Sequence, residues 1–233
     1  MPNHITNRIE IKGDLDRVKS ILQKIKNDEA GMGTIDFEKI IPMPDNIFKG
    51  NLGPREQELY GKNNWYDWSV ANWGTKWNAY GFEPDTDHSK EKEIRFLTAW
   101  SAPHPILEKL AKLFPDVKLE HEWADEDIGM NCGRCVYYDG ERIEEYYPES
   151  QKDRLEFAAR VMDIRLEEAC GLYLNASETE YINIEYDDEY ELIELFGQPA
   201  LFTNDRITDA DIPKGMVLSI SLDTFYSNKN YEA

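Results

Sequence analysis

The chain has 233 residues, with 46 acidic against 26 basic side chains and a net charge of −20. Hydrophobic residues make up 41% of it, which is enough for a packed core and argues against global disorder. No stretch approaches the roughly 20 apolar residues of a membrane span, and the first residues lack the apolar core of a signal peptide. We therefore expect a cytoplasmic protein with one large or two small domains.

The negative charge is concentrated in the C-terminal part. Residues 141–233 hold 22 acids against 8 bases, and between Arg165 and Arg206 there are eleven acids and no lysine or arginine. Such a surface repels a phosphate backbone, so we expect no duplex nucleic-acid binding by this part. Two interpretations stay open: a solvated face that maintains solubility, or a surface that imitates nucleic acid and binds a basic partner.

The first 147 residues predict an α+β domain. Alternating apolar residues, helical spacings, proline stops and the Asp139-Gly140 turn signal identify the elements. The expected strands are 5–12, 34–41, 93–100, 117–123, 132–138 and 142–147, with helices following Asp14 and Pro103. This order is the ferredoxin-like β-α-β-β-α-β pattern with an added hairpin.

A long aromatic insert separates the second and third expected strands. Residues 45–90 contain WYDWSVANWGTKW, in which four of the six tryptophans lie within thirteen residues. Tryptophan buries a large area and brings an N–H group that needs a partner once it is buried. We therefore expect short helices packed onto the sheet rather than a structureless loop.

The remaining residues predict a connector helix and a small acidic α+β module. Apolar residues recur at helical spacing over 151–170, and we expect domain boundaries at 1–148, 149–170 and 171–233. Within the module the expected strands are 172–174, 181–186, 200–203 and 216–222, with a helix at 188–196.

Several N-terminal segments together resemble the YubB-type ferredoxin-like family of plasmids and phages. They are MPNHITNRIEIKG, IIPMP, NWGTKWNAY, FLTAWSAPHPILEKLAKLFPDV and the CG…YYDGE hairpin. This resemblance implies a ferredoxin-like fold and a mobile element in a bacterial host, and it carries over no catalytic residues. The stretch ALFTNDRITDADIPKG is similar to small domains of large phage and conjugative-element polyproteins, which again implies a mobile-element accessory.

Motifs that could carry chemistry are incomplete. Cys132 and Cys135 form a CxxC, but structural zinc needs four ligands and no second pair is present. The acidic runs at 125–127 and 187–189 could hold a divalent cation, but metal nucleases draw such acids from separate strands, and a solvated turn explains these runs better. No phosphate-binding glycine loop or nucleophile elbow occurs. We therefore expect no cofactor, no resident metal and no catalytic residues.

Two groups of residues are the predicted partner-binding sites. The tryptophans could anchor the core, form a groove for a peptide or protein, or stack nucleic-acid bases. The acids could imitate phosphates, because alternate residues of a strand are about 6.6 Å apart, which is close to the spacing of phosphates along one strand of nucleic acid. The predicted residues are Trp65, Trp68, Trp73, Lys76 and Trp77 in the insert, and Glu178, Glu180, Glu185, Asp187, Asp188, Glu189 and Glu191 in the acidic part.

These observations lead to three functional hypotheses. In the first, a non-enzymatic accessory of a phage or plasmid binds and inhibits a basic, nucleic-acid-handling protein of the host or a competitor, as an anti-defence DNA mimic. In the second, an accessory of conjugation or replication docks a peptide or a single strand on the tryptophan-rich insert. A metal-dependent enzyme is the third.

Overall fold

The structure is a computed structural model that describes residues 2–82, 93–183, 191–195, 198–202, 213–215 and 219–220. It divides into two compact units, Met1–Pro148 and Glu149–Ala233, and each is described by itself. Within the described residues, no helix has both the length and the apolar character needed to cross a bilayer.

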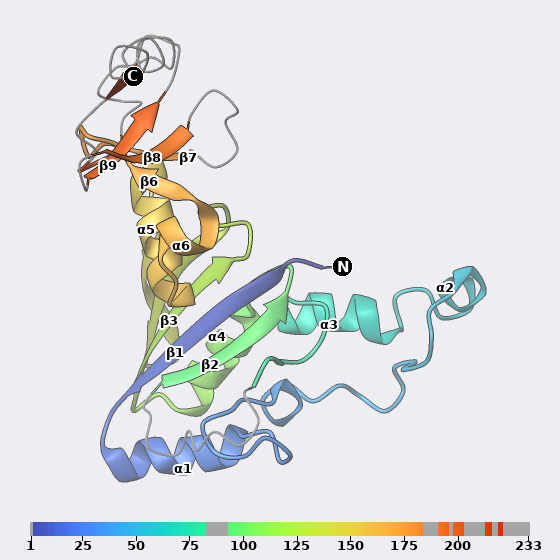
Figure 1. The fold of residues 1–233 in the computed structure, drawn as a ribbon. Coiled ribbons are helices and arrows are strands. Elements are labelled where there is room, and N and C mark those ends of the chain that lie inside the picture. Colours follow the sequence, from blue (N-terminus) through green and yellow to red (C-terminus); the bar gives the residue numbers. More distant parts are fainter. Residues whose placement is uncertain are drawn as a thin grey trace, which may run out of the picture. The chain divides into compact units, whose positions relative to one another are not determined.

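The first unit is built on a five-stranded antiparallel sheet with strand order β2-β1-β3-β4-β5 (Figure 1). The neighbours are antiparallel throughout, with Ile9 opposite both Ile94 and His121. The strands are β1 His4–Lys12, β2 Glu93–Ala99, β3 Lys118–Asp125, β4 Cys132–Tyr138 and β5 Glu141–Tyr146.

The chain order confirms the predicted ferredoxin-like class. β2, helix α4 (His104–Leu113) and β3 form a β-α-β unit that is split by β1 between its two strands. β4 and β5 are the added hairpin, and both residues of its Asp139-Gly140 turn have positive φ, as a type I′ turn requires.

The expected strand at 34–41 is wrong. Phe37–Lys39 is instead the single 3₁₀ turn η1, begun by Asp36, whose side chain accepts a hydrogen bond from the Glu38 N–H. The outer edge of β2 is contacted by Tyr80, which forms a two-way backbone bridge with Leu97. Alternating apolar residues suggested a strand, but a local side-chain cap and the returning insert gave these residues other partners.

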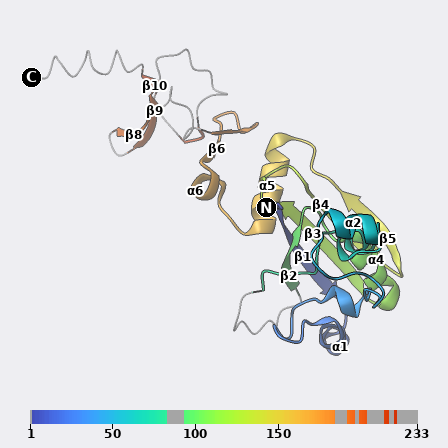
Figure 2. The ribbon, with the colours of Figure 1, turned by 90° about the vertical axis from the view of Figure 1, so that its right-hand side faces the viewer.

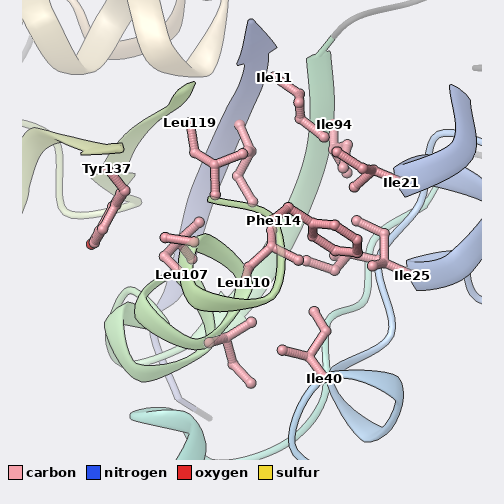
Figure 3. Packing of buried hydrophobic residues seen from close by; sticks show 14 of the residues in the cluster. Ile11, Ile21, Ile25, Ile40, Ile94, Leu107, Leu110, Phe114, Leu119 and Tyr137 are labelled. Carbon is pink, nitrogen blue, oxygen red and sulfur yellow. The ribbon is translucent and has the colours of Figure 1, made fainter. Parts of the chain in front are cut away.

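Helices α1 (Leu15–Ile25) and α4 cover one face of the sheet. Asp14 caps α1 by accepting hydrogen bonds from two backbone N–H groups, as its position predicted. Figure 3 shows the apolar side chains of both helices meeting those of the strands, and Figure 2 shows α1 below the strands and α4 beside β5. The labelled core residues include Ile11, Ile21, Ile25, Ile94, Leu107, Leu110 and Leu119.

Polar side chains also lie in this core. The Asn7 amide donates to Thr98 Oγ1 at 2.9 Å, so its Oδ1 faces His121 Nε2 at 3.0 Å and accepts the imidazole proton. The His121 ring stacks on Trp123 and has no described partner at Nδ1. His104 lies edge-on to Trp123 with 4.7 Å between ring centroids. Burial lowers the pKa of His121 well below its usual value and also lowers the pKa of His104.

The aromatic insert contains helices α2 (Pro54–Tyr60) and α3 (Trp65–Trp73), which confirms the expectation of short helices. Figure 1 shows α2 at the far right, away from the strands, and α3 nearer to them. Asn64 caps α3 by accepting the Asp67 N–H, and α3 contacts α4. The insert therefore packs on the unit through α3.

The second unit combines two helices with short strands. α5 (Gln151–Met162) and α6 (Leu166–Cys170) replace the single expected helix, because Asp163 adopts a left-handed conformation that ends α5. The strands are β6 Leu172–Leu174, β7 Tyr181–Asn183, β8 Glu191–Leu195, β9 Gln198–Phe202 and β10 Ser219–Ile220.

The expected helix at 188–196 is wrong where the structure describes it. Glu191–Leu195 is strand β8, paired antiparallel with β9, and β10 pairs parallel with β9. Gly197 and Pro199 suggested the end of a helix, whereas Leu195 and Gln198 are register partners in a hairpin. Five residues of mixed apolar and acidic character fit either structure, and only the β9 partner selects the strand.

We expect the free energy of unfolding to fall as the pH is lowered below about 6.5, the usual pKa of histidine. Because the folded-state pKa values of His104 and His121 are lowered, the unfolded chain binds more protons in this range. Each histidine contributes at most about 1.4 kcal/mol per pH unit. Urea titrations at several pH values measure this slope. The double variant His104→Gln/His121→Gln should show a flatter slope, and an unchanged slope would contradict the assignment.

Gly133→Ala should destabilise the first unit. A Cβ at Gly133 would lie 2.8 Å from Trp123 Cζ2 and 2.9 Å from the Tyr146 carbonyl oxygen, so the strands or the indole must shift. We expect a loss of about 1–3 kcal/mol in chemical denaturation, as for other overpacked cores. Arg134→Ala on the same strand is the control, since a half-exposed ion pair contributes less. Equal free energies of unfolding for the two variants would show that the neighbouring strands or the indole shift without loss of stability.

Candidate functional site

The Trp-Gly-Thr-Lys-Trp segment begins with a core anchor. Trp73 is 3% exposed, and its indole N–H donates to the Ile41 carbonyl at 2.8 Å. Its ring meets Phe37 and Trp68 edge-to-face, with centroids 5.9 and 5.4 Å apart. Two of the predicted binding tryptophans, Trp68 and Trp73, therefore serve packing.

The next two residues attach the segment to the end of the sheet. Gly74 has φ 77°, and a Cβ there would lie 2.8 Å from Pro105 Cδ, so glycine alone fits this turn. The buried Thr75 hydroxyl donates to the Ala99 carbonyl at 2.7 Å and accepts the Ala99 N–H at 3.1 Å. Ser69 Oγ donates to the Lys76 carbonyl at 2.5 Å. The backbone at Lys76 is therefore fixed by the hydrogen bonds of Thr75 before it and by the bond from Ser69 to its own carbonyl.

Trp100 lies directly after β2 in an unusual conformation. Its φ is 73°, which is left-handed backbone that bulky residues rarely adopt. Its N–H donates to the Asn3 carbonyl at 2.9 Å, and 42% of the residue is exposed. Strained backbone of this kind is concentrated at functional sites, where the surrounding structure enforces it. In this conformation the Trp100 indole lies at the surface.

Lys76 lies between two indoles. Its Nζ is 4.6 Å from the centroid of the Trp77 ring and 4.8 Å from that of Trp100. Both distances are within the range of a cation–π interaction, which holds the ammonium beside the aromatic surface. Tyr66 meets the Trp100 ring edge-to-face at 6.0 Å. The Trp100 ring is thus contacted by the Lys76 ammonium and by the Tyr66 ring.

Tyr66, Lys76 and Trp100 line a groove of about 470 Å³ in the first unit. This volume is within the range of small-molecule sites. The Trp65 indole N–H donates to the Gly50 carbonyl at 3.1 Å, which joins the start of α3 to the loop before α2. The lining residues are Lys49, Gly50, Asn51, Leu52, Gln57, Trp65, Tyr66, Lys76 and Trp100. We call this the Trp–Lys groove.

The Trp–Lys groove is locally cationic in an acidic chain. Lys49 and Lys76 are the charged side chains among its lining residues, and neither forms an ion pair with the described part of the chain. Residues 45–82 contain four acids and four bases, whereas the whole chain has a net charge of −20. The groove lining therefore carries a net positive charge, which favours a negatively charged ligand there.

The predicted residues of the insert do not all lie at the groove. Trp65 and Lys76 line the groove, and Trp77 contacts Lys76. Among the charged and aromatic residues that line the groove, sequence reasoning missed three: Lys49, Tyr66 and Trp100. Trp100 is far from the cluster in sequence, and only the β2 end brings it there. Nothing in the local sequence pattern indicated its left-handed backbone.

The acidic residues are only partly described. Glu178 has a left-handed φ of 61° in the turn between β6 and β7 and forms an ion pair with Lys214 at 3.0 Å. The extended spacing assumed for Glu178 and Glu180 is therefore wrong, because a strand conformation does not continue through this turn. Glu191 belongs to β8. Four predicted residues lie outside the described residues: Glu185, Asp187, Asp188 and Glu189.

The CxxC lies in strand β4, where residues three apart point to opposite faces of the sheet. Cys132 and Cys135 are both buried and form no disulfide, and burial raises the pKa of the Cys135 thiol. A chelating pair on one face is therefore not formed. Among the described residues, no group of three His, Cys, Asp or Glu side chains could hold a metal ion.

Two protein families match parts of the chain. Residues 72–165 are similar to the ferredoxin-like domain in Api92-like protein, and residues 186–218 to large polyvalent protein associated domain 28. Comparison with curated proteins found no match, and comparison with solved structures found none either.

The first match includes Lys76, Trp77 and Trp100, and it excludes the loop of Lys49, since it starts at residue 72. The matches support the ferredoxin-like fold and a general likeness to mobile-element domains, not the YubB type in particular. Neither family description names a catalytic activity. The two families are compatible with an accessory protein of a mobile element.

Proposed function

We propose that this chain is a non-enzymatic, mobile-element accessory protein that works by binding, and that the Trp–Lys groove holds an extended, negatively charged polymer segment. The observation that carries the proposal is the pair of lysines beside the strained, exposed Trp100 in a chain of net charge −20. The matched families support the mobile-element setting.

The groove is built before a ligand arrives. The Thr75 hydroxyl ties the insert to Ala99, and the Trp65 indole joins α3 to Gly50. Rigid aromatic side chains lose little conformational entropy on binding, so a fixed groove keeps more of its interaction energy as affinity.

The lysines supply the attraction for a negative ligand. Exposed charges separated by more than the Debye length of about 8 Å are largely screened at physiological salt. Any acid of residues 141–233 that lies more than this distance from Lys49 and Lys76 therefore has little effect on the electrostatic potential at the two lysines. A polymer with regularly spaced negative groups could contact both lysines.

Reversing the groove charge should weaken binding of anionic polymers. Labelled single-stranded DNA and labelled polyglutamate are each tested against the native chain by fluorescence anisotropy at low salt. We expect at least one of the two polymers to bind. Lys49→Glu/Lys76→Glu should weaken that binding by about tenfold or more. Lys62→Glu is the control, because Lys62 is exposed and outside the groove lining. Equal losses in both variants, or no binding by either polymer, would reject the groove as the site.

A second candidate function rests on the acidic stretch between Arg165 and Arg206, which has eleven acids and no base. In this proposal the stretch imitates nucleic acid and inhibits a basic, nucleic-acid-handling protein. The charge distribution supports it, and it requires no groove.

The acidic candidate predicts salt-sensitive capture of a basic protein from host lysate. The native tagged chain should retain it at low salt and release it at high salt, because exposed charge pairs are screened. Reversal of Glu185, Asp187, Asp188, Glu189 and Glu191 to lysine should prevent both capture and inhibition of that protein's nucleic-acid binding. Inhibition that survives the reversal would refute this candidate.

A further inference from the structure

We infer that the polymer segment held by the Trp–Lys groove is single-stranded nucleic acid, with a base against Trp100 and the flanking phosphates beside Lys49 and Lys76. This inference rests on the proposed function and names its ligand. Two features of the groove, its aromatic side chains and its charge, support a nucleotide more than other anions.

The aromatic side chains need a ligand with flat faces. Trp65, Tyr66 and Trp100 line the groove, and 42% of Trp100 is exposed although its backbone is strained. Every base has a π-face, so stacking on such rings is tolerant of sequence. An acidic peptide would satisfy the lysines and leave the indole surface without a matching partner.

The backbone of the groove offers little to a peptide. Peptides that bind as an added strand use free main-chain groups at a sheet edge. In the groove, the Gly50 carbonyl already accepts the Trp65 indole N–H. Outside the groove lining, the Leu97 N–H and carbonyl at the edge of β2 pair with Tyr80. The side chains that line the groove are mainly aromatic, amide and lysine groups.

Lys76 leaves one face of Trp100 for a base. Its Nζ lies over the Trp100 ring, 4.8 Å from the centroid, so a base must stack on the opposite face of this indole or displace the ammonium, which would then be available to the phosphate. Lys49 offers a second exposed contact. Duplex nucleic acid fits less well, because its bases are already stacked on one another and offer no free face to an indole.

The test compares three labelled polymers with the full chain: a short oligothymidylate, an abasic oligomer with the same number of phosphates, and polyglutamate. Oligothymidylate should bind, and the abasic oligomer should bind about tenfold more weakly, since stacking contributes per base. With two phosphate contacts, the logarithm of the binding constant should fall against log salt with a slope of about −1.4. Lys49→Gln should reduce that slope by about half.

The matched variants separate stacking from folding. Trp100→Gly keeps the left-handed backbone and removes the indole, and Tyr66→Leu removes a second ring; both should weaken oligothymidylate binding by about fivefold or more. Tyr138→Ala removes an exposed aromatic residue that does not line the groove and should bind normally. Circular dichroism checks that each variant is folded.

Each remaining outcome overturns the inference in a distinct way. Equal affinity for the abasic oligomer and oligothymidylate would show that only charge is recognised. Groove-dependent binding of polyglutamate without oligothymidylate would refute single-stranded nucleic acid and leave the proposed groove function standing. Binding of neither polymer would reject both proposals.

Discussion

The two hydrogen bonds between the Thr75 hydroxyl and the backbone of Ala99 are the interaction on which the candidate site depends. They join the insert to the end of β2 at the residue immediately before Trp100. Burial strengthens them, because neither partner can exchange its bond for water without a desolvation cost. The position of Lys76, one residue after Thr75, and that of Trp100, one residue after Ala99, are thereby coupled.

The sheet supplies the rigid support for this coupling. β2 is held by β1 along its length, and β1 in turn pairs with β3, so the end of β2 has little freedom. Core packing of α1 and α4 on the same face adds the apolar burial that stabilises the sheet. Binding residues on loops that a rigid scaffold positions are a common arrangement, and Lys76 and Trp100 of the proposed site lie in such loops.

Charge in this protein acts locally. A net charge of −20 keeps a chain soluble and discourages general contact with nucleic acid, but it says little about one groove with two lysines. The buried His121 follows the same rule, since its pKa is lowered chiefly by its own burial. Local surroundings rather than composition therefore determine how each titratable or charged group behaves.

Short-range patterns in the sequence determined most of the first unit. Alternation identified β1 to β5, helical spacing identified α1 and α4, and Asp14 and Asp139-Gly140 marked a cap and a turn. These signals depend on neighbouring residues, so they can be read without the fold. They failed at 34–41, at 191–195 and at Asp163, where a side-chain cap, a strand partner or a left-handed residue outweighed the pattern.

The tryptophan cluster by itself indicated that the insert matters and left its role open. Only the tertiary structure separated the core anchors, Trp68 and Trp73, from the groove residues, Trp65 and Lys76. Only the structure added Trp100, which comes from a different segment. The physical reason is that burial, backbone strain and ring contacts arise between residues distant in sequence, and no local pattern encodes which of them will meet.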